Sequence, residues 1–209
     1  MQNNRTPIFD KFHNLKAGTP VGGGLLIIVS VSILFACLLP ILQFSKIYVS
    51  SNYKLNLELE VIFFTFVSFG LLGLYDDILK FFNFQKSGFL GLRFKHKIIL
   101  QLLTAGFISL LIYFRLGTDF IYIPFLGAVK LGILFVPIST IIITTFANFF
   151  NITDGLDGLS CGILVISLFA FWILAGSSLD TPISLFISLW IGALIAFLYF
   201  NIYPARLWL

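Results

Sequence analysis

The sequence carries very little charge: Asp, Glu, Lys and Arg make up 11% of its 209 residues, against about 25% in a typical soluble protein. Hydrophobic residues make up 59%, and the mean hydropathy is +1.04. A soluble core cannot hide that much apolar surface, so the composition indicates an integral membrane protein. The net charge is only +4, and the basic residues sit in short loops, so we expect no nucleic-acid partner.

Cysteine and histidine are equally scarce, with two of each. Cys37 and Cys161 both fall inside apolar runs, where a thiol behaves as a small hydrophobe, so neither a disulfide nor a zinc site is expected. His13 and His96 are isolated, which is typical of solvated loop residues.

The apolar residues form six runs, each long enough to cross a lipid bilayer, which takes roughly 20 residues. We therefore predict an all-α fold: a polytopic transmembrane helical bundle that forms one catalytic domain, with no internal repeat and no separate soluble domain. The predicted spans are approximately residues 24–44, 59–75, 98–114, 131–150, 159–176 and 183–201.

Alternation of the spans places the N-terminal segment, loops 76–97 and 151–158 and the C-terminal tail on one side of the membrane. That side carries nine of the thirteen basic residues. By the positive-inside rule it is predicted to be cytoplasmic. Every polar motif described below falls on this same side.

The most polar stretch follows the fourth predicted span. Asn148, Asn151 and Asp154 are spaced i, i+3, i+6, so a helix would project all three along one stripe. Glycines then permit a sharp turn, so that Asp154 and Asp157 can face one ligand. Oxygen donors of this kind suit Mg²⁺ or sugar hydroxyls. The alternatives are a polar turn with capping side chains and, less favoured because no Glu follows at the twelfth position, a calcium loop.

Asp76, Asp77 and Lys80 close the second predicted span. Two carboxylates at the end of a helix oppose its dipole, and Lys80 can neutralise only one of them. The surplus charge calls for a metal or a protonated carboxyl, and the spacing suits Mg²⁺-bridged phosphates. A solvated acidic pair at the membrane edge is the alternative.

Two basic motifs are weaker. Lys16 and Thr19 lie in a glycine-rich segment before the first span, which suits an anion site but also a simple start to a membrane helix. Lys97 lies four residues before Gln101 and is a candidate phosphate ligand, with contact to anionic headgroups as the alternative. The remaining acids are expected to have solvated structural roles: Asp10, Glu58, Glu60, Asp119 and Asp180.

Four motifs occur in order along the chain: Lys-x-Gly-Thr-Pro-x-x-Gly-Gly from Lys16, Asp-Asp-x-x-Lys from Asp76, Lys-x-x-x-Gln from Lys97, and Asn-x-x-Asn-x-x-Asp-Gly-x-Asp-Gly from Asn148. Together they cover essentially the whole chain, and the set resembles the phospho-N-acetylmuramoyl-pentapeptide-transferase family, within glycosyltransferase family 4. Four motifs in this order are far more specific than any one of them.

The resemblance implies a Mg²⁺-dependent enzyme at the cytoplasmic face of a bacterial inner membrane. Such an enzyme transfers phospho-N-acetylmuramoyl-pentapeptide from UDP-MurNAc-pentapeptide to undecaprenyl phosphate, and its products are lipid I and UMP. The expected partners are these two substrates and the lipid bilayer, and a homodimer remains open.

The resemblance also implies roles for individual residues. Asp76, Asp77 and Asp154 would be catalytic, and together with Asn151 they would hold the metal. Trp208 stands where the family has an aromatic residue that stacks on the nucleobase. The expected substrate-binding residues are Lys16, Thr19, Lys80, Lys97, Asn148, Asp157, Asn201 and Trp208.

The sequence departs from the family in two respects. Val21 and Gly22 stand where the family usually has Thr-Met, which affects only local nucleoside contacts. The family also has a further span before Lys16 and, after Leu209, a Gly-Asp-x-Gly-Ser segment and a His-rich loop. We therefore expect a fragment truncated at both ends, inactive by itself because a third catalytic aspartate and the His loop are absent.

Two rival hypotheses remain. A sister enzyme that moves N-acetylhexosamine 1-phosphate from a UDP-sugar to a polyprenyl phosphate shares the acidic boxes, but such enzymes usually carry an Arg before the glycine pair. A cation-coupled transporter predicts acids near the middle of the spans, whereas the candidate acids here lie at span ends.

Overall fold

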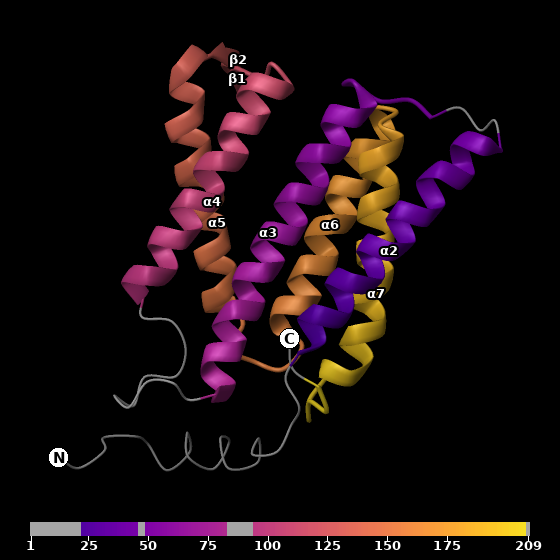
Figure 1. The fold of residues 1–209 in the computed structure, drawn as a ribbon, viewed down its shortest axis with the longest axis vertical. Coiled ribbons are helices and arrows are strands. Elements are labelled where there is room, and N and C mark those ends of the chain that lie inside the picture. Colours follow the sequence, from indigo (N-terminus) through magenta and orange to yellow (C-terminus); the bar gives the residue numbers. More distant parts are fainter. Residues whose placement is uncertain (1–21, 46–48, 83–93, 208–209) are drawn as a thin grey trace.

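The computed structural model describes residues 22–45, 49–82 and 94–207. Figure 1 shows long helices running side by side. Six of them are long and apolar enough to cross a membrane, which confirms the predicted helical membrane bundle. They are α2 (Gly23–Phe44), α3 (Leu55–Phe82), α4 (Phe94–Arg115), α5 (Phe135–Thr153), α6 (Leu159–Ser177) and α7 (Thr181–Asn201).

The helices pack as two groups. In the first, α7 contacts α2, α3 and α6, and the buried core lies there. The ring of Phe35 on α2 is fully buried, with its centroid 5.3 Å from the rings of both Phe63 on α3 and Phe186 on α7. In the second group, α4 pairs with α5 at one side of the molecule (Figure 1). Because α3 also packs against α4, it joins the two groups.

The second predicted span is longer than the hydropathy indicated. Helix α3 continues to Phe82, so Asp76 and Asp77 lie inside it rather than at its end. The apolar Ile78 and Leu79 extend the helical pattern past the two acids. The influence of the helix dipole falls off within the last turn, so it weighs less on the acid pair than the sequence suggested.

The loop before α5 contains a β-hairpin that the sequence analysis did not predict. Strand β1 (Phe120–Ile123) pairs antiparallel with β2 (Gly127–Lys130), with Phe120 opposite Lys130. A 3₁₀ turn, η1 (Gly132–Leu134), then leads into α5. The segment is rich in β-branched and aromatic residues, which favour strands. It is so short that hydropathy does not distinguish it from the long apolar runs on either side.

Three loops meet at the end of the bundle that carries this hairpin, which we call the hairpin rim. The Thr181 backbone N–H donates to Ser50 O at 2.9 Å, tying the loop before α3 to the start of α7. The hydroxyls of Tyr53 and Thr118 lie 3.3 Å apart, so the loop after α4 joins the same group. The described residues of loops 45–58, 115–130 and 177–182 therefore share one rim, as alternation of the spans predicts.

Two acids at the hairpin rim are not solvated, contrary to the sequence-based expectation. Glu58 and Asp180 are each only 2% exposed. Asp180 Oδ1 accepts the Ile183 backbone N–H at 3.2 Å, which caps α7, and its Oδ2 accepts from the Asn52 side chain at 3.1 Å. The Glu58 carboxyl bonds to the Ser51 hydroxyl. Both acids are buried because loop residues 49–54 fold over them, which hydropathy cannot reveal.

Candidate active site

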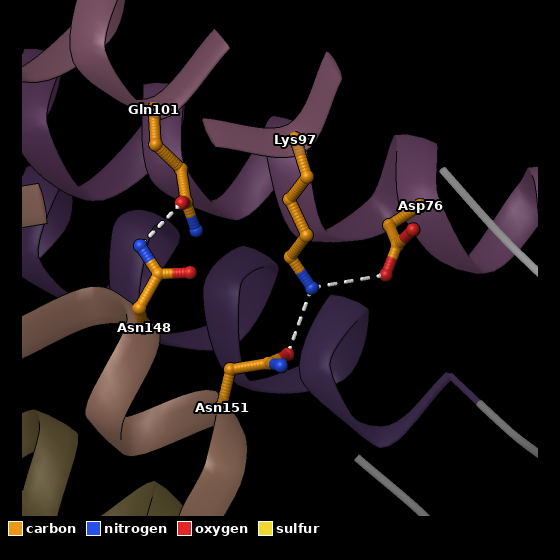
Figure 2. Close-up of polar contacts among 5 residues, drawn as sticks. All are labelled: Asp76, Lys97, Gln101, Asn148 and Asn151. Atoms are coloured by element: carbon orange, nitrogen blue, oxygen red, sulfur yellow. Dashed lines mark hydrogen bonds and ion pairs between the residues drawn. The ribbon is translucent and has the colours of Figure 1, made fainter. Parts of the chain in front are cut away.

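Three helices meet at the ammonium group of Lys97. Lys97 stands in the first turn of α4, and its Nζ lies 3.3 Å from Asp76 Oδ2 on α3. The same Nζ donates to Asn151 Oδ1 on α5 at 2.8 Å (Figure 2). Residues far apart in the sequence thus converge at the end of the bundle opposite the hairpin, which we call the site rim.

A second bridge joins α4 to α5 one turn deeper. Asn148 Nδ2 donates to Gln101 Oε1 at 2.7 Å (Figure 2). The same Nδ2 donates to the Thr144 carbonyl at 2.8 Å. Gln101 lies at i+4 from Lys97, and Asn151 lies at i+3 from Asn148, so each helix presents its pair on one face. Of the predicted helical stripe of three residues, Asn148 and Asn151 are present on α5 and face α4, whereas Asp154 lies past the end of the helix.

The contact between Lys97 and Asp76 is largely withdrawn from solvent. The two side chains are 16% and 8% exposed, respectively. A pair so buried is screened less than a surface pair, and loss of one partner leaves an uncompensated charge. An ammonium has three N–H donors, and the described contacts use two of them.

The turn between α5 and α6 carries the next two acids. The Asp154 backbone N–H donates to Phe150 O at 3.2 Å and ends α5, so this aspartate lies just past the helix rather than inside it. Its Oδ1 accepts the Ser160 hydroxyl at 2.6 Å. Asp157 Oδ2 accepts the Ala205 backbone N–H at 3.2 Å, which ties the turn to the segment after α7.

Asn201 also holds this turn. It is buried at the end of α7, and its Oδ1 accepts the Gly158 backbone N–H at 2.9 Å. Its Nδ2 donates to the Leu207 carbonyl at 2.9 Å. Gly158 has a φ of 76°, a conformation that favours glycine. The Asn201 amide is therefore engaged with two backbone groups and ties the turn before α6 to the segment after α7.

The structure brings most of the predicted site residues to one rim. Asp77 lies half-buried beside Asp76 on α3. Four predicted positions lie outside the described residues or have side chains that are not described: Lys16, Thr19, Lys80 and Trp208.

Two residues near the site were not predicted as part of it. Ser160 is 1% exposed, and its hydroxyl orients Asp154. Its only signal in the sequence is its place at the start of an apolar run, six residues after Asp154, which does not separate it from other membrane serines. Gln101 had a clearer signal, because it follows Lys97 by one helical turn.

The donors at the site rim are oxygens of carboxylates and amides, the ligands that Mg²⁺ prefers. Within the described part of the chain, no three His, Cys, Asp or Glu side chains gather as a metal-binding group. Mg²⁺ is usually held by one or two carboxylates together with phosphates and waters. The residues therefore fit a magnesium ion shared with a diphosphate, and not an all-protein metal cage.

Several curated proteins are similar to this chain over nearly its whole length. The phospho-N-acetylmuramoyl-pentapeptide-transferase of Clostridium botulinum strain Eklund 17B is 34% identical over 200 residues, 95% of this chain and 56% of that protein. The proteins of the same name from Clostridium beijerinckii and Caldanaerobacter subterraneus are 32% identical over 202 residues and 34% identical over 199. These alignments also cover 95% of this chain, and 57% and 58% of those proteins.

The chain thus spans a little over half the length of the curated relatives it matches. A family model described as glycosyl transferase family 4 matches residues 59–209. That match takes in α3 from residue 59 onward and all of α4 to α7, and with them every described contact of the site rim. The chain therefore belongs to glycosyl transferase family 4.

Proposed function

We propose that this chain carries the site of an enzyme that transfers phospho-N-acetylmuramoyl-pentapeptide from UDP-MurNAc-pentapeptide to undecaprenyl phosphate, releasing UMP and lipid I. The proposal is carried by one observation, the junction of Asp76, Lys97 and Asn151. Relatives that bear the name of this transferase support it.

The reaction explains why the site needs cationic groups. An oxygen of the lipid phosphate forms a bond to the β-phosphorus of the nucleotide, and the bond from that phosphorus to UMP breaks. Three phosphate groups must approach one another, so positive charge has to offset their repulsion. In the proposed mechanism Lys97 binds the phosphates. Its Nζ gives up its contact with Asp76 or with Asn151 and donates to a phosphate oxygen instead.

We further propose that Asp76, Asp77, Asn151 and Asp154 hold Mg²⁺. When bound, the ion would neutralise charge on the diphosphate. One of the two α3 aspartates would accept the proton of the lipid phosphate. Ser160 would keep the Asp154 carboxylate oriented by the hydrogen bond it donates.

The other predicted residues take binding roles in this proposal. Asn148 supports Asn151 one turn below it, and Asp157 and Asn201 shape the wall near the end of α7. Nucleotide contacts are proposed for the predicted positions without described side chains: Lys16, Thr19, Lys80 and Trp208.

The protein is a multi-pass membrane protein, with six helices able to span a membrane among the residues that the structure describes. We propose that the site rim faces the cytoplasm of a bacterium, at its inner membrane. The support is electrostatic, because nine of the thirteen basic residues belong to the predicted cytoplasmic side.

The test uses membranes that contain the protein expressed from its complete reading frame. Radiolabelled UDP-MurNAc-pentapeptide, undecaprenyl phosphate and Mg²⁺ are supplied, and lipid I and UMP are separated and counted. A parallel reaction receives UDP-N-acetylglucosamine. We expect a lipid product from the muramoyl nucleotide alone, and a product from the hexosamine nucleotide alone would reassign the substrate. When Mg²⁺ is omitted and a chelator is added, the formation of lipid I and UMP should be abolished.

A further inference from the structure

The β-hairpin at the hairpin rim is apolar although it lies outside the spans. Residues 120–130 contain one charged side chain, Lys130, at the end of β2. Its large apolar side chains point outward rather than into a core. The exposed ones are Phe120, Tyr122, Ile123, Phe125 and Leu126.

The tip of the hairpin is the most exposed part. Phe125 is 107% exposed, so its ring makes no appreciable contact with the described chain. Its φ of 71° lies in the left-handed region, which a bulky residue rarely adopts. A two-stranded sheet is only marginally stable by itself in water. An apolar tip held in this conformation marks an interaction surface.

The hairpin connects two helices that are long and apolar enough to cross a membrane. The hairpin joins α4 to α5, the pair at one side of the molecule (Figure 1). The last turn of α4 exposes Phe114, and η1 exposes Ile133 and Leu134. Exposed apolar side chains of two helices long enough to cross a membrane therefore flank the hairpin on both sides in the chain.

Charge marks the polar boundary of this surface. Lys130 Nζ lies 3.3 Å from Asp119 Oδ2, and Arg115 pairs with Glu60 at 3.4 Å. These ion pairs stand where the helices end and the strands begin, while the tip between Tyr122 and Leu126 is uncharged. Charge at the base and aromatic side chains at the tip are typical of a segment that lies in the membrane interface.

We propose that the hairpin tip, residues 122–126, inserts into the bilayer interface and anchors the hairpin rim beside α4 and α5. The occupant of this surface is lipid. The inference concerns the rim opposite the site and does not depend on the proposed reaction.

The test measures where the tip lies in a membrane. A nitroxide label is attached to Phe125→Cys in a Cys37→Ser, Cys161→Ser background, and the protein is placed in vesicles of phosphatidylethanolamine and phosphatidylglycerol. Collision rates are measured with oxygen, which concentrates in lipid, and with the water-soluble complex Ni-EDDA. Lys54→Cys in the loop before α3 gives the aqueous reference, and Ile141→Cys on the exposed face of α5 gives the lipid reference.

We expect the label at position 125 to collide with Ni-EDDA several-fold less often than the label at 54, with oxygen collisions close to those at 141. A Ni-EDDA rate equal to that at 54 would place the tip in water and overturn the proposal. Protection from both reagents would mean that protein covers the tip, which also overturns it. A label at Leu126→Cys repeats the measurement without disturbing the conformation of Phe125.

Discussion

Lys97 links three helices through one ammonium group. Because Lys97 contacts Asp76 and Asn151, a substitution here removes a positive charge from beside a buried carboxylate. The proposed catalytic role and local stability therefore involve the same residue, and a test of that role has to separate them.

Replacement of Lys97 by Met is expected to lower transfer activity by about two to three orders of magnitude, because such a change removes a charged donor aimed at the reacting phosphates. Lys97→Arg should restore part of the loss. Lys95→Met, on the exposed side of the same helical turn, is the matched control and should stay close to wild type. Activity in membranes is normalised to folded protein by gel filtration. Near wild-type activity of folded Lys97→Met would remove Lys97 from the mechanism.

Ser160 offers a subtler test, since its hydroxyl donates a hydrogen bond to Asp154. A hydrogen bond to a charged group is worth about 1.5–3 kcal/mol, so Ser160→Ala should lower activity by roughly one to two orders of magnitude. Ser167→Ala is the control, because that hydroxyl donates to its own helix at Ile163 O. The measurement is the initial rate of UMP release. Equal rates for the two variants would show that Asp154 needs no orientation.

Local spacing predicted some of these residues and missed others. The i, i+3 pair of asparagines could be predicted, because both lie on one helix and face the same neighbour. Ser160 could not be predicted, because its contact with Asp154 depends on the conformation of the turn between α5 and α6. Glu58 was misjudged for the same reason, as loop residues 49–54 cover it.

The cap of α7 is a single polar contact whose loss is expected to lower the free energy of unfolding. Asp180→Ala removes the acceptor of the Ile183 N–H and of Asn52. A lost cap lowers the free energy of unfolding by about 0.5–2 kcal/mol. Asp180→Asn should recover most of it, because asparagine also caps helices well. Asp119→Ala breaks a mostly exposed ion pair, where the expected loss is about 0–1 kcal/mol.

The measurement is unfolding of the purified protein in mixed micelles, followed by the far-ultraviolet circular dichroism signal as the fraction of sodium dodecyl sulfate rises. If Asp180→Asn loses as much stability as Asp180→Ala, the buried charge rather than the cap is the stabilising feature.

The helices could be predicted from the sequence where a long run of apolar residues defines them. All six long helices coincide with predicted spans, because each span must satisfy its own backbone hydrogen bonds in lipid and a helix does so. The end of α3 and the hairpin could not be predicted in the same way. Both depend on packing beyond the hydrocarbon region, where average hydropathy carries no signal.

The whole molecule separates its polar groups into two rims, and vesicle labelling can test that division. In the cysteine-free background, Lys95→Cys and Leu156→Cys are exposed at the site rim, and Leu179→Cys is exposed at the hairpin rim. An impermeant maleimide added to right-side-out vesicles should label only Leu179→Cys, and inverted vesicles should show the opposite pattern. Labelling of Lys95→Cys and Leu156→Cys from opposite compartments would dismantle the proposed site.

The site rim spans both helix groups. Asn151 is tied to α4 through Lys97, whereas Asp154, three residues later, is tied to α6 through Ser160. The few residues between them therefore connect the two helix groups. A shift of one helix group relative to the other would therefore change the distance between the proposed catalytic oxygens.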